Sequence, residues 1–114
     1  MAEGVHFFVL RSDGSAAACG GVLFVGAEGD EPAYAEVKRM YVRPEFRGYG
    51  FGRAILRRLA DHARGRGVTV LRLETGVHQV EAMGLYEATG FTSIGPFGPY
   101  VDDPLSRCYE IRLD

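Results

Sequence analysis

Apolar residues recur at two different spacings along the chain, and each spacing predicts a different kind of element. Short apolar or alternating runs, bounded by glycine, proline and other turn residues, are typical of β-strands. Such runs predict strands at 5–10, 16–25, 33–42, 68–74, 91–94 and 106–113. Apolar residues at helical spacing predict one helix from Phe51 to Ala63 and a shorter helix from Val80 to Thr89.

The order of these elements predicts how the strands are connected. The turn sequence Ser12-Asp13-Gly14 separates the first two runs, so residues 5–25 are expected to form a hairpin. A strand, a helix and a second strand follow one another over 33–74, and such a connection joins parallel strands. The chain has 114 residues, which suits a single domain, 1–114.

Charge is unevenly distributed, although the net charge is only −2. Residues 38–66 contain nine basic and two acidic residues, which gives this segment a charge of +7 and leaves −9 for the remainder. A basic segment of this kind suits a polyanionic ligand. Because the whole chain is acidic and has no nucleic-acid-binding motif, we expect no nucleic acid partner.

Several classes of protein do not fit the sequence. No apolar run is long enough to cross a bilayer, and the N-terminus lacks the features of a secretion signal, so a cytoplasmic protein without membrane contact is expected. Cys19 and Cys108 lie far apart in apolar surroundings and are expected to be buried free thiols. No group of His and Cys has metal-ligand spacing, so no metal site is expected.

The most informative segment is 43–52, Arg-Pro-Glu-Phe-Arg-Gly-Tyr-Gly-Phe-Gly, between the third strand and the long helix. Its glycines allow backbone N–H groups to approach a ligand closely. The first N–H groups of a helix lack partners and carry partial positive charge, so this junction is a candidate anion site. No Ser, Thr, Asp or Asn precedes the helix to cap these groups, which leaves them for a ligand or water.

Two common phosphate motifs do not match this segment. Arg53 stands where a P-loop requires Lys, and also where a dinucleotide fingerprint requires a third glycine. The pattern that fits is Arg-x-x-Gly-x-Gly, formed by Arg47, Gly50 and Gly52. It resembles the acyl-coenzyme A pyrophosphate loop of the GNAT superfamily of N-acetyltransferases.

A second segment, 79–91, is similar to the second conserved block of the same superfamily. It contains Gln79, the pair Leu85-Tyr86 and the pair Gly90-Phe91 in the order and spacing of that block. The resemblance implies an α+β (mixed α/β) fold of GNAT type. This fold has a mostly antiparallel mixed sheet, a central parallel β-α-β unit and two helices.

The resemblance also implies which residues bind acetyl-coenzyme A (acetyl-CoA). In the family, the strand before the glycine turn splays away from the next parallel strand. Its free backbone groups, at the end of the third strand here, would pair with the pantetheine arm, and N–H groups of the glycine turn would hold the pyrophosphate. In the second block, an amide residue and a small residue would lie near the pantetheine. The expected cofactor-binding residues are Met40, Tyr41, Val42, Arg47, Gly48, Tyr49, Gly50, Phe51, Gly52, Arg53, Gln79, Ala82 and Tyr86.

Two residues are candidates for proton transfer. Tyr86 occupies the position where the family places the general acid for the departing thiolate, and a phenol is protonated at pH 7. The alternative is a core tyrosine. Glu36, on the third strand, is the candidate general base, acting through water. Alternatively it is a carboxylate on an edge strand, paired with Lys38 or an Arg. Glu74 and His78 are rival bases.

The resemblance implies an N-acetyltransferase that transfers acetyl from acetyl-CoA to a primary amine by direct attack on the thioester. The family normally begins with a strand and two helices that form one wall of the acceptor cleft, and only a few residues precede the first predicted strand here. The alternative is therefore a non-catalytic acyl-CoA-binding module, or part of an assembly such as a homodimer that completes the acceptor site.

The loop before the last strand is a candidate flank of the acceptor site. It is rigid and aromatic for a linker, and its acidic groups favour a cationic acceptor, either a small-molecule or a peptide amine. The residues of interest are Tyr100, Asp102, Asp103 and Ser106.

Overall fold

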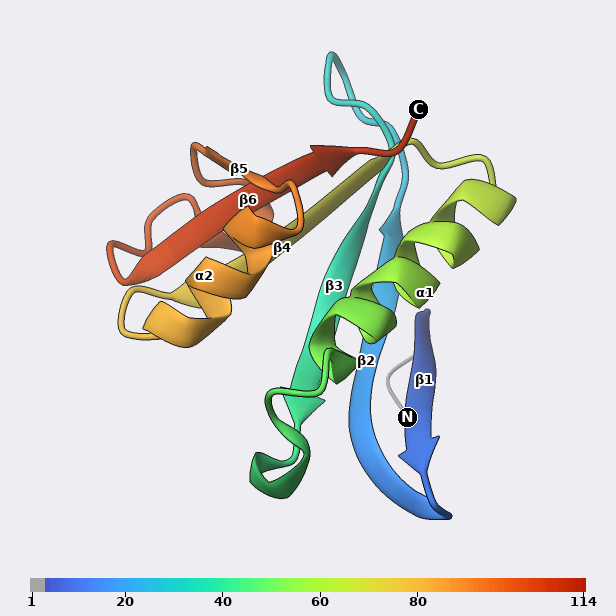
Figure 1. The fold of residues 1–114 in the computed structure, drawn as a ribbon. Helices are drawn as coiled ribbons and strands as arrows, with labels where there is room; N and C mark the ends of the chain where they lie inside the picture. Colours follow the sequence, from blue (N-terminus) through green and yellow to red (C-terminus); the bar gives the residue numbers. More distant parts are fainter. Residues whose placement is uncertain (1–3) are drawn as a thin grey trace.

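The computed structural model describes residues 4–114 and contains one six-stranded mixed sheet with two α-helices, which confirms the predicted fold class (Figure 1). The strands are β1 (Val5–Ser12), β2 (Ser15–Val25), β3 (Tyr34–Val42), β4 (Val70–Gly76), β5 (Thr92–Ile94) and β6 (Ser106–Arg112). The helices are α1 (Phe51–Gly65) and α2 (Val80–Ala88), with 3-10 turns η1 (Pro44–Phe46) and η2 (Gly98–Tyr100). In the sheet the strands lie in the order β1-β2-β3-β4-β6-β5.

The predicted hairpin at the N-terminal end is confirmed. β1 and β2 pair in antiparallel fashion and are joined by Asp13 and Gly14. Both turn residues have positive φ, 51° and 81°, which is the conformation of the two-residue turns that match the twist of a hairpin.

Both helices cover the same face of the sheet (Figure 1). One stripe of α1 is buried there, because its apolar residues recur at intervals of three and four. This stripe packs against alternate residues of the central strands, among them Val22, Val37 and Leu71, and Tyr86 of α2 joins the same core. A smaller apolar cluster on the opposite face contains Tyr34, Val70, Phe97 and Cys108.

The parallel pair at the centre of the sheet is short. β3 and β4 pair only at Ala35↔Leu71 and Glu36↔Arg72, and beyond these residues β3 stays with β2 while β4 stays with β6. The two strands therefore separate toward their C-terminal ends, as Figure 1 shows. We call the resulting gap in the hydrogen-bonding pattern the strand opening, and Glu36 marks its apex. Neither α1 nor α2 is long and apolar enough to span a membrane.

Candidate active site

The glycine turn lies directly between β3 and α1. Gly48 and Gly50 have φ values of 86° and 81°, a left-handed conformation that favours glycine. Nothing lies within 4 Å of a Cβ built at either residue, so the space above the turn is open. Gly50 precedes α1 and no side chain caps the helix, as the sequence predicted. The N–H groups of the first turn of α1 therefore face a space that a ligand can enter.

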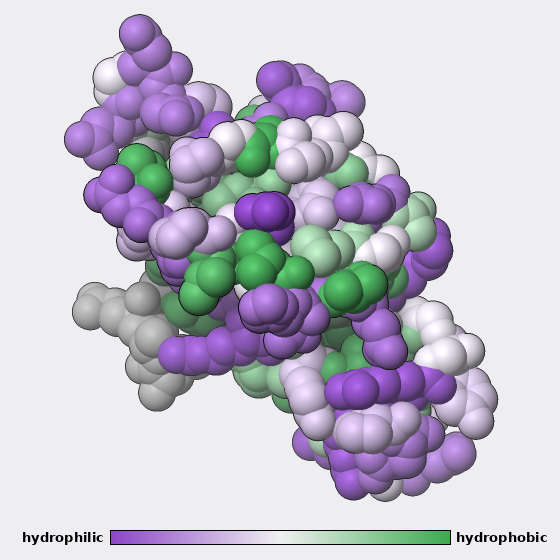
Figure 2. Space-filling view, turned by 90° about the vertical axis from the view of Figure 1, so that its left-hand side faces the viewer, coloured by the Kyte–Doolittle hydropathy of each residue, from purple (hydrophilic) through white to green (hydrophobic). Residues whose placement is uncertain are grey.

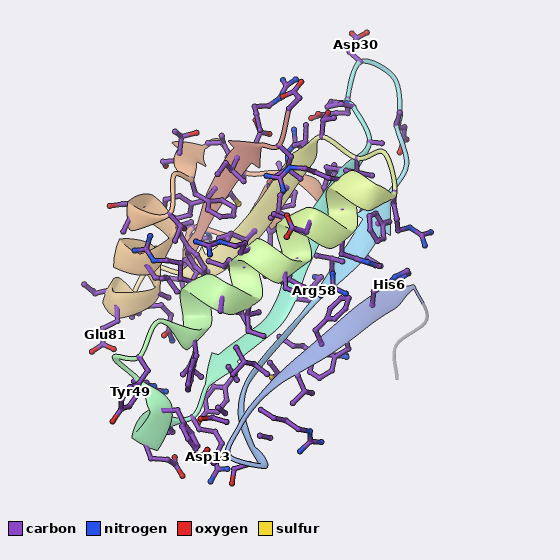
Figure 3. The ribbon with its side chains drawn as sticks, turned by 45° about the vertical axis from the view of Figure 1, so that its right-hand side comes forward. His6, Asp13, Asp30, Tyr49, Arg58 and Glu81 are labelled. Atoms are coloured by element: carbon purple, nitrogen blue, oxygen red, sulfur yellow. The ribbon has the colours of Figure 1, made fainter. Side chains whose placement is uncertain are left out.

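Gly52 brings the two conserved sequence segments together. A Cβ at this residue would lie 3.0 Å from Leu85 Cδ2 of α2, 3.5 Å from Val42 Cγ2 and 3.7 Å from Met40 Cε. The start of α1 thus packs closely against α2 and the end of β3. Figure 3 shows the same arrangement: Tyr49 of the glycine turn and Glu81 of α2 lie at one end of the molecule.

Arg47 is engaged with the strand that precedes it. Its Nε donates a hydrogen bond of 3.0 Å to the carbonyl oxygen of Val42, and its guanidinium lies 5.8 Å from the ring centre of Tyr41. Tyr41 and Tyr49 are exposed, at 51% and 71%. The backbone N–H of Arg47 donates to the carbonyl oxygen of Pro44 at 3.3 Å, so its Nε and its backbone N–H both have partners within the chain. The predicted role of Arg47 at a pyrophosphate site stays a prediction.

A bulge in β3, which sequence reasoning missed, lies beside the strand opening. Arg39 and Met40 face only Gly20 of β2, and Arg39 has a positive φ of 55°. A side chain at Gly20 would lie 2.9 Å from Ile55 Cγ2 of α1, so this position excludes larger residues. The signal was present, because the pair Gly20-Gly21 interrupts a predicted strand, and glycine inside a strand often marks a bulge.

The first two turns of α2 border the strand opening on the side opposite the bulge in β3. Gln79 is exposed at the start of α2 and its side chain does not cap the helix, while Ala82 is half-buried against the core. Figure 2 faces this side of the molecule and shows hydrophobic side chains gathered near its centre. Exposed hydrophobic residues of α2 and of the loop before β6 are Val80, Val101 and Leu105.

Tyr86 lies on the helix-covered face and is only 6% exposed. Its ring packs edge-on against Phe91, with the ring centres 5.9 Å apart, and beside Tyr109. Burial raises the pKa of the Tyr86 phenol, and the nearby carboxylate of Glu74 raises it further, so the hydroxyl is protonated at neutral pH. No described residue forms a hydrogen bond with this hydroxyl, and none of the described buried side-chain polar atoms lacks a partner. The hydroxyl oxygen therefore keeps some contact with solvent.

Glu36 lies on the opposite face of the sheet and is 3% exposed. The hydroxyl of Tyr100 donates a hydrogen bond of 2.7 Å to its Oε2, and Lys38 Nζ lies 3.1 Å from the same oxygen. Lys38 also donates to the Tyr100 hydroxyl at 3.1 Å. We call these three residues the apex cluster. The pairing of Glu36 with Lys38 that the alternative interpretation predicted is present, although β3 is a central strand and not an edge strand.

Hydrogen bonds within the apex cluster affect the protonation of Lys38 and Tyr100. Burial acts to lower the pKa of Lys38, but hydrogen bonds to Tyr100 and Glu36 outweigh burial and raise it. Burial and the hydrogen bond to Glu36 raise the pKa of Tyr100, against the opposing effect of Lys38. Both Lys38 and Tyr100 are therefore protonated at neutral pH.

The rival base Glu74 lies at the far end of β4, beside the loop that was predicted to flank the acceptor. Ser106 Oγ lies 2.7 Å from Glu74 Oε2 and 3.0 Å from Asp103 Oδ2. One hydroxyl proton can serve only one of the two carboxylates at a time. An open hollow of about 710 Å³ lies along this loop, which joins β5 to β6, and at the adjoining ends of the two strands. His78, the third candidate base, is exposed.

The two cysteines do not pair, and only one is buried. Burial raises the pKa of the Cys108 thiol, and the residue is 3% exposed. Cys19 is half-buried, so the prediction of a buried thiol was wrong for this residue; its Sγ lies 3.5 Å from the carbonyl oxygen of Arg39, at the bulge. Within residues 4–114, no group of three or more His, Cys, Asp or Glu is arranged to hold a metal ion.

Comparisons with known proteins agree with this arrangement. A model of the acetyltransferase (GNAT) family matches residues 1–91. An IAA acetyltransferase of Azospirillum brasilense is 46% identical over 109 residues, which cover 96% of this chain and 69% of that protein. The chain thus spans about two thirds of the length of this relative.

Solved structures share the fold. A Klebsiella pneumoniae protein described as an acyl-CoA N-acyltransferase superposes with a TM-score of 0.86 at 37% identity, covering 98% of this chain and 74% of that one. A Salmonella typhimurium structure that contains acetyl-CoA superposes with a TM-score of 0.75 at 24% identity, covering 97% of this chain and 66% of that one. The chain described here belongs to the GNAT family of acetyltransferases.

Proposed function

We propose that this chain is an acetyl-CoA-dependent N-acetyltransferase that acts on a primary amine. The observation that carries the proposal is the position of the strand opening. β3 leaves β4 after Glu36 and leads within a few residues to the open glycine turn at the start of α1. Unpaired strand edges and unpaired helix N–H groups therefore follow one another, which suits an extended amide-containing arm that ends in a diphosphate.

The fit to the diphosphate rests on the turn itself. Gly48 and Gly50 leave open space above their backbone, and Arg53 follows in the first turn of α1. The charge of +7 over residues 38–66 favours a polyanion at this end of the chain. The presence of acetyl-CoA in the Salmonella typhimurium structure supports the same ligand here.

Acetyl-CoA, when bound, supplies an acetyl group activated as a thioester. Backbone groups of Met40 to Val42 would orient the arm beside the bulge. Glu36 would remove the proton of the amine through the apex cluster or a water molecule, and Tyr86 would hold the proton that the departing thiolate requires. Cys108 is not suited to form an acyl-enzyme, because burial raises the pKa of its thiol.

Acidic groups beside the strand opening support a cationic acceptor. Glu74 and Asp103 both approach Ser106, which lies at the edge of the hollow along the loop that joins β5 to β6. A primary ammonium group on a small molecule or a peptide would suit this region by charge. A panel of amines, assayed by the release of free coenzyme A thiol, would rank these two classes.

The first test of the proposal is whether acetyl-CoA stabilises the folded chain against unfolding. Acetyl-CoA at 100 times its dissociation constant should stabilise the chain by about 2.7 kcal/mol, whereas ATP and NAD should give no comparable rise in melting temperature. Selective stabilisation together with amine-dependent thiol release would support an enzyme. Stabilisation without thiol release from any amine would favour the acyl-CoA-binding module. No stabilisation of the folded chain would contradict both.

A further inference from the structure

Lys38 is the only lysine in the sequence; the other twelve of its thirteen basic residues are arginines. This difference matters for acyl transfer. A guanidinium remains protonated in proteins and does not act as a nucleophile at neutral pH, whereas a lysine amine that loses its proton is a good nucleophile and a common site of acetylation. The chain therefore carries a single side-chain amine, and its position can be compared directly with that of the proposed catalytic groups.

That amine lies next to the proposed general base. Lys38 Nζ is 3.1 Å from Glu36 Oε2, within reach for direct proton transfer, and it donates to the Tyr100 hydroxyl at 3.1 Å. The Lys38 side chain is 31% exposed, while that of Glu36 is 4% exposed. An acceptor amine that uses Glu36 directly as its base would compete with Lys38 Nζ for the same carboxylate.

The amine is also close to Met40, the first of the residues proposed to orient the pantetheine arm. Lys38 lies two residues before Met40 on β3, which corresponds to about 7 Å along a strand. Its side chain shares the sheet face of Glu36, because the bulge follows it at Arg39 and Met40. The flexible four-carbon stem of lysine is long enough to cross a distance of this order.

From this geometry we propose that Lys38 is a self-acetylation site, modified by acetyl-CoA bound to the same chain. The inference rests on the proposed function. Glu36 accepts a proton from the Lys38 ammonium, and the freed Nζ forms a bond to the acetyl carbonyl carbon. The carbon–sulfur bond breaks, and the thiolate takes a proton from Tyr86. The acylated nitrogen loses its second proton to solvent, and the Tyr86 phenolate regains one from solvent. The products are Nε-acetyl-Lys38 and coenzyme A.

Measuring the intact mass of the chain tests the inference, because Lys38 carries the only side-chain amine that acetyl-CoA could acetylate. The purified chain, incubated with acetyl-CoA, should gain the mass of one acetyl group, and peptide mapping should place it on Lys38. The fractional rate should not depend on protein concentration, since the transfer occurs within one chain. Lys38→Arg should lose the modification, and Glu36→Gln should slow it at least about tenfold, as expected for the loss of a general base.

Arg112→Lys is the matched control for uncatalysed acetylation, in which acetyl-CoA reacts directly with an exposed lysine. The Arg112 side chain is 64% exposed at the end of β6 and pairs only with Asp114 among the described residues. A lysine at this position should stay unmodified while Lys38 reacts. Equal modification of both lysines, or equal modification of Lys38 in the urea-unfolded chain, would overturn the inference, because either result would indicate uncatalysed transfer.

Stability measurements separate failure of this inference from failure of the proposed function. If acetyl-CoA stabilises the wild-type chain and Lys38→Arg alike and amines still release thiol, absence of acetyl on Lys38 overturns self-acetylation alone. If acetyl-CoA stabilises neither protein, the proposed function fails and the inference fails with it.

Discussion

At the scale of single residues, burial gives Tyr86 a property that a general acid needs. The phenol is 6% exposed and its pKa is raised, first by burial and then by Glu74. A raised pKa extends the protonated form to higher pH. The acid should therefore remain available throughout the neutral range, and activity that depends on it should decline only as the pH rises through this raised pKa, above the ordinary value near 10.

Replacing Tyr86 by Phe should separate catalysis from binding. We expect kcat to fall by about 10²-fold or more, because the change removes a transferable proton. The Kd for acetyl-CoA should change little, since the ring and its contacts remain. Thiol release and calorimetry measure the two quantities.

Tyr109→Phe is the matched control for this substitution. Tyr109 is also buried beside Tyr86, but its hydroxyl donates to Glu87 at 2.9 Å. Its loss should cost about 1 kcal/mol of stability and leave kcat unchanged. Equal loss of kcat in both variants would remove Tyr86 from the mechanism.

The sequence predicted individual residues best where a local pattern specified them. The glycine turn and the Leu85-Tyr86 pair are local patterns, and the structure brings Leu85 against Gly52 at the end of the turn. The hydrogen bond between Tyr100 and Glu36 joins residues 64 positions apart, and no local pattern specifies such a contact. The half-buried state of Cys19 was also missed, because its apolar sequence neighbours do not show that its Sγ lies beside the carbonyl oxygen of Arg39, 20 positions away.

At the scale of elements, the glycines at the two ends of α1, Gly50 and Gly65, have opposite conformational requirements. Gly50, before the first turn, has a φ of 81°. Gly65, the last helical residue, has no such φ. A Cβ at either position would meet nothing within 4 Å, so steric contacts with other residues do not distinguish them.

The two substitutions to alanine should therefore have opposite effects on stability. Gly50→Ala should destabilise the chain by about 1–2 kcal/mol, because it places a side chain in the left-handed region. Gly65→Ala should stabilise it by about 0.5 kcal/mol, since alanine loses less conformational freedom in a helix. Urea unfolding followed by circular dichroism measures both, and a stabilised Gly50→Ala would contradict the conformation of the turn.

The boundaries of elements were predicted less well than their order. The fourth strand was expected at 68–74 and lies at Val70–Gly76. Val68 has the apolar character of a strand residue because it packs on the core, yet pairing with β6 begins only at Val70. An apolar pattern reports burial, and burial does not by itself determine where a hydrogen-bonded ladder starts.

At the scale of the whole molecule, uneven charge should govern how the proposed cofactor binds. Residues 38–66 carry +7 and the remainder carries −9. The Kd for acetyl-CoA should rise several-fold when ionic strength increases from about 0.01 M to about 1 M, because the screening length falls from about 30 Å to about 3 Å.

Pantetheine, which lacks the phosphates, is the control ligand for this measurement. Its weaker binding should change little over the same range of salt. Titration calorimetry of both ligands at each salt concentration provides the comparison. If acetyl-CoA and pantetheine respond equally, electrostatic attraction to the basic segment is not the cause.

The overall topology was only partly accessible from the sequence. Periodicity predicted the order of elements and the parallel connection through α1, because these depend on neighbouring segments. The lateral position of β6 between β4 and β5 depends on pairing between distant segments, and the separation of β3 from β4 was expected only through family resemblance. The predicted homodimer, the single-domain boundary and the cytoplasmic location stay predictions.

The strand opening also has a consequence for how the molecule resists local unfolding. Backbone pairing joins β1, β2 and β3 into one group of strands and β4, β5 and β6 into another, and two residue pairs connect the groups through the sheet. α1 packs across both groups in a shared core, so the ends of β3 and β4 are the parts that can open without disrupting the core. A ligand that spans the strand opening would add contacts between these ends, so its departure should make them easier to open.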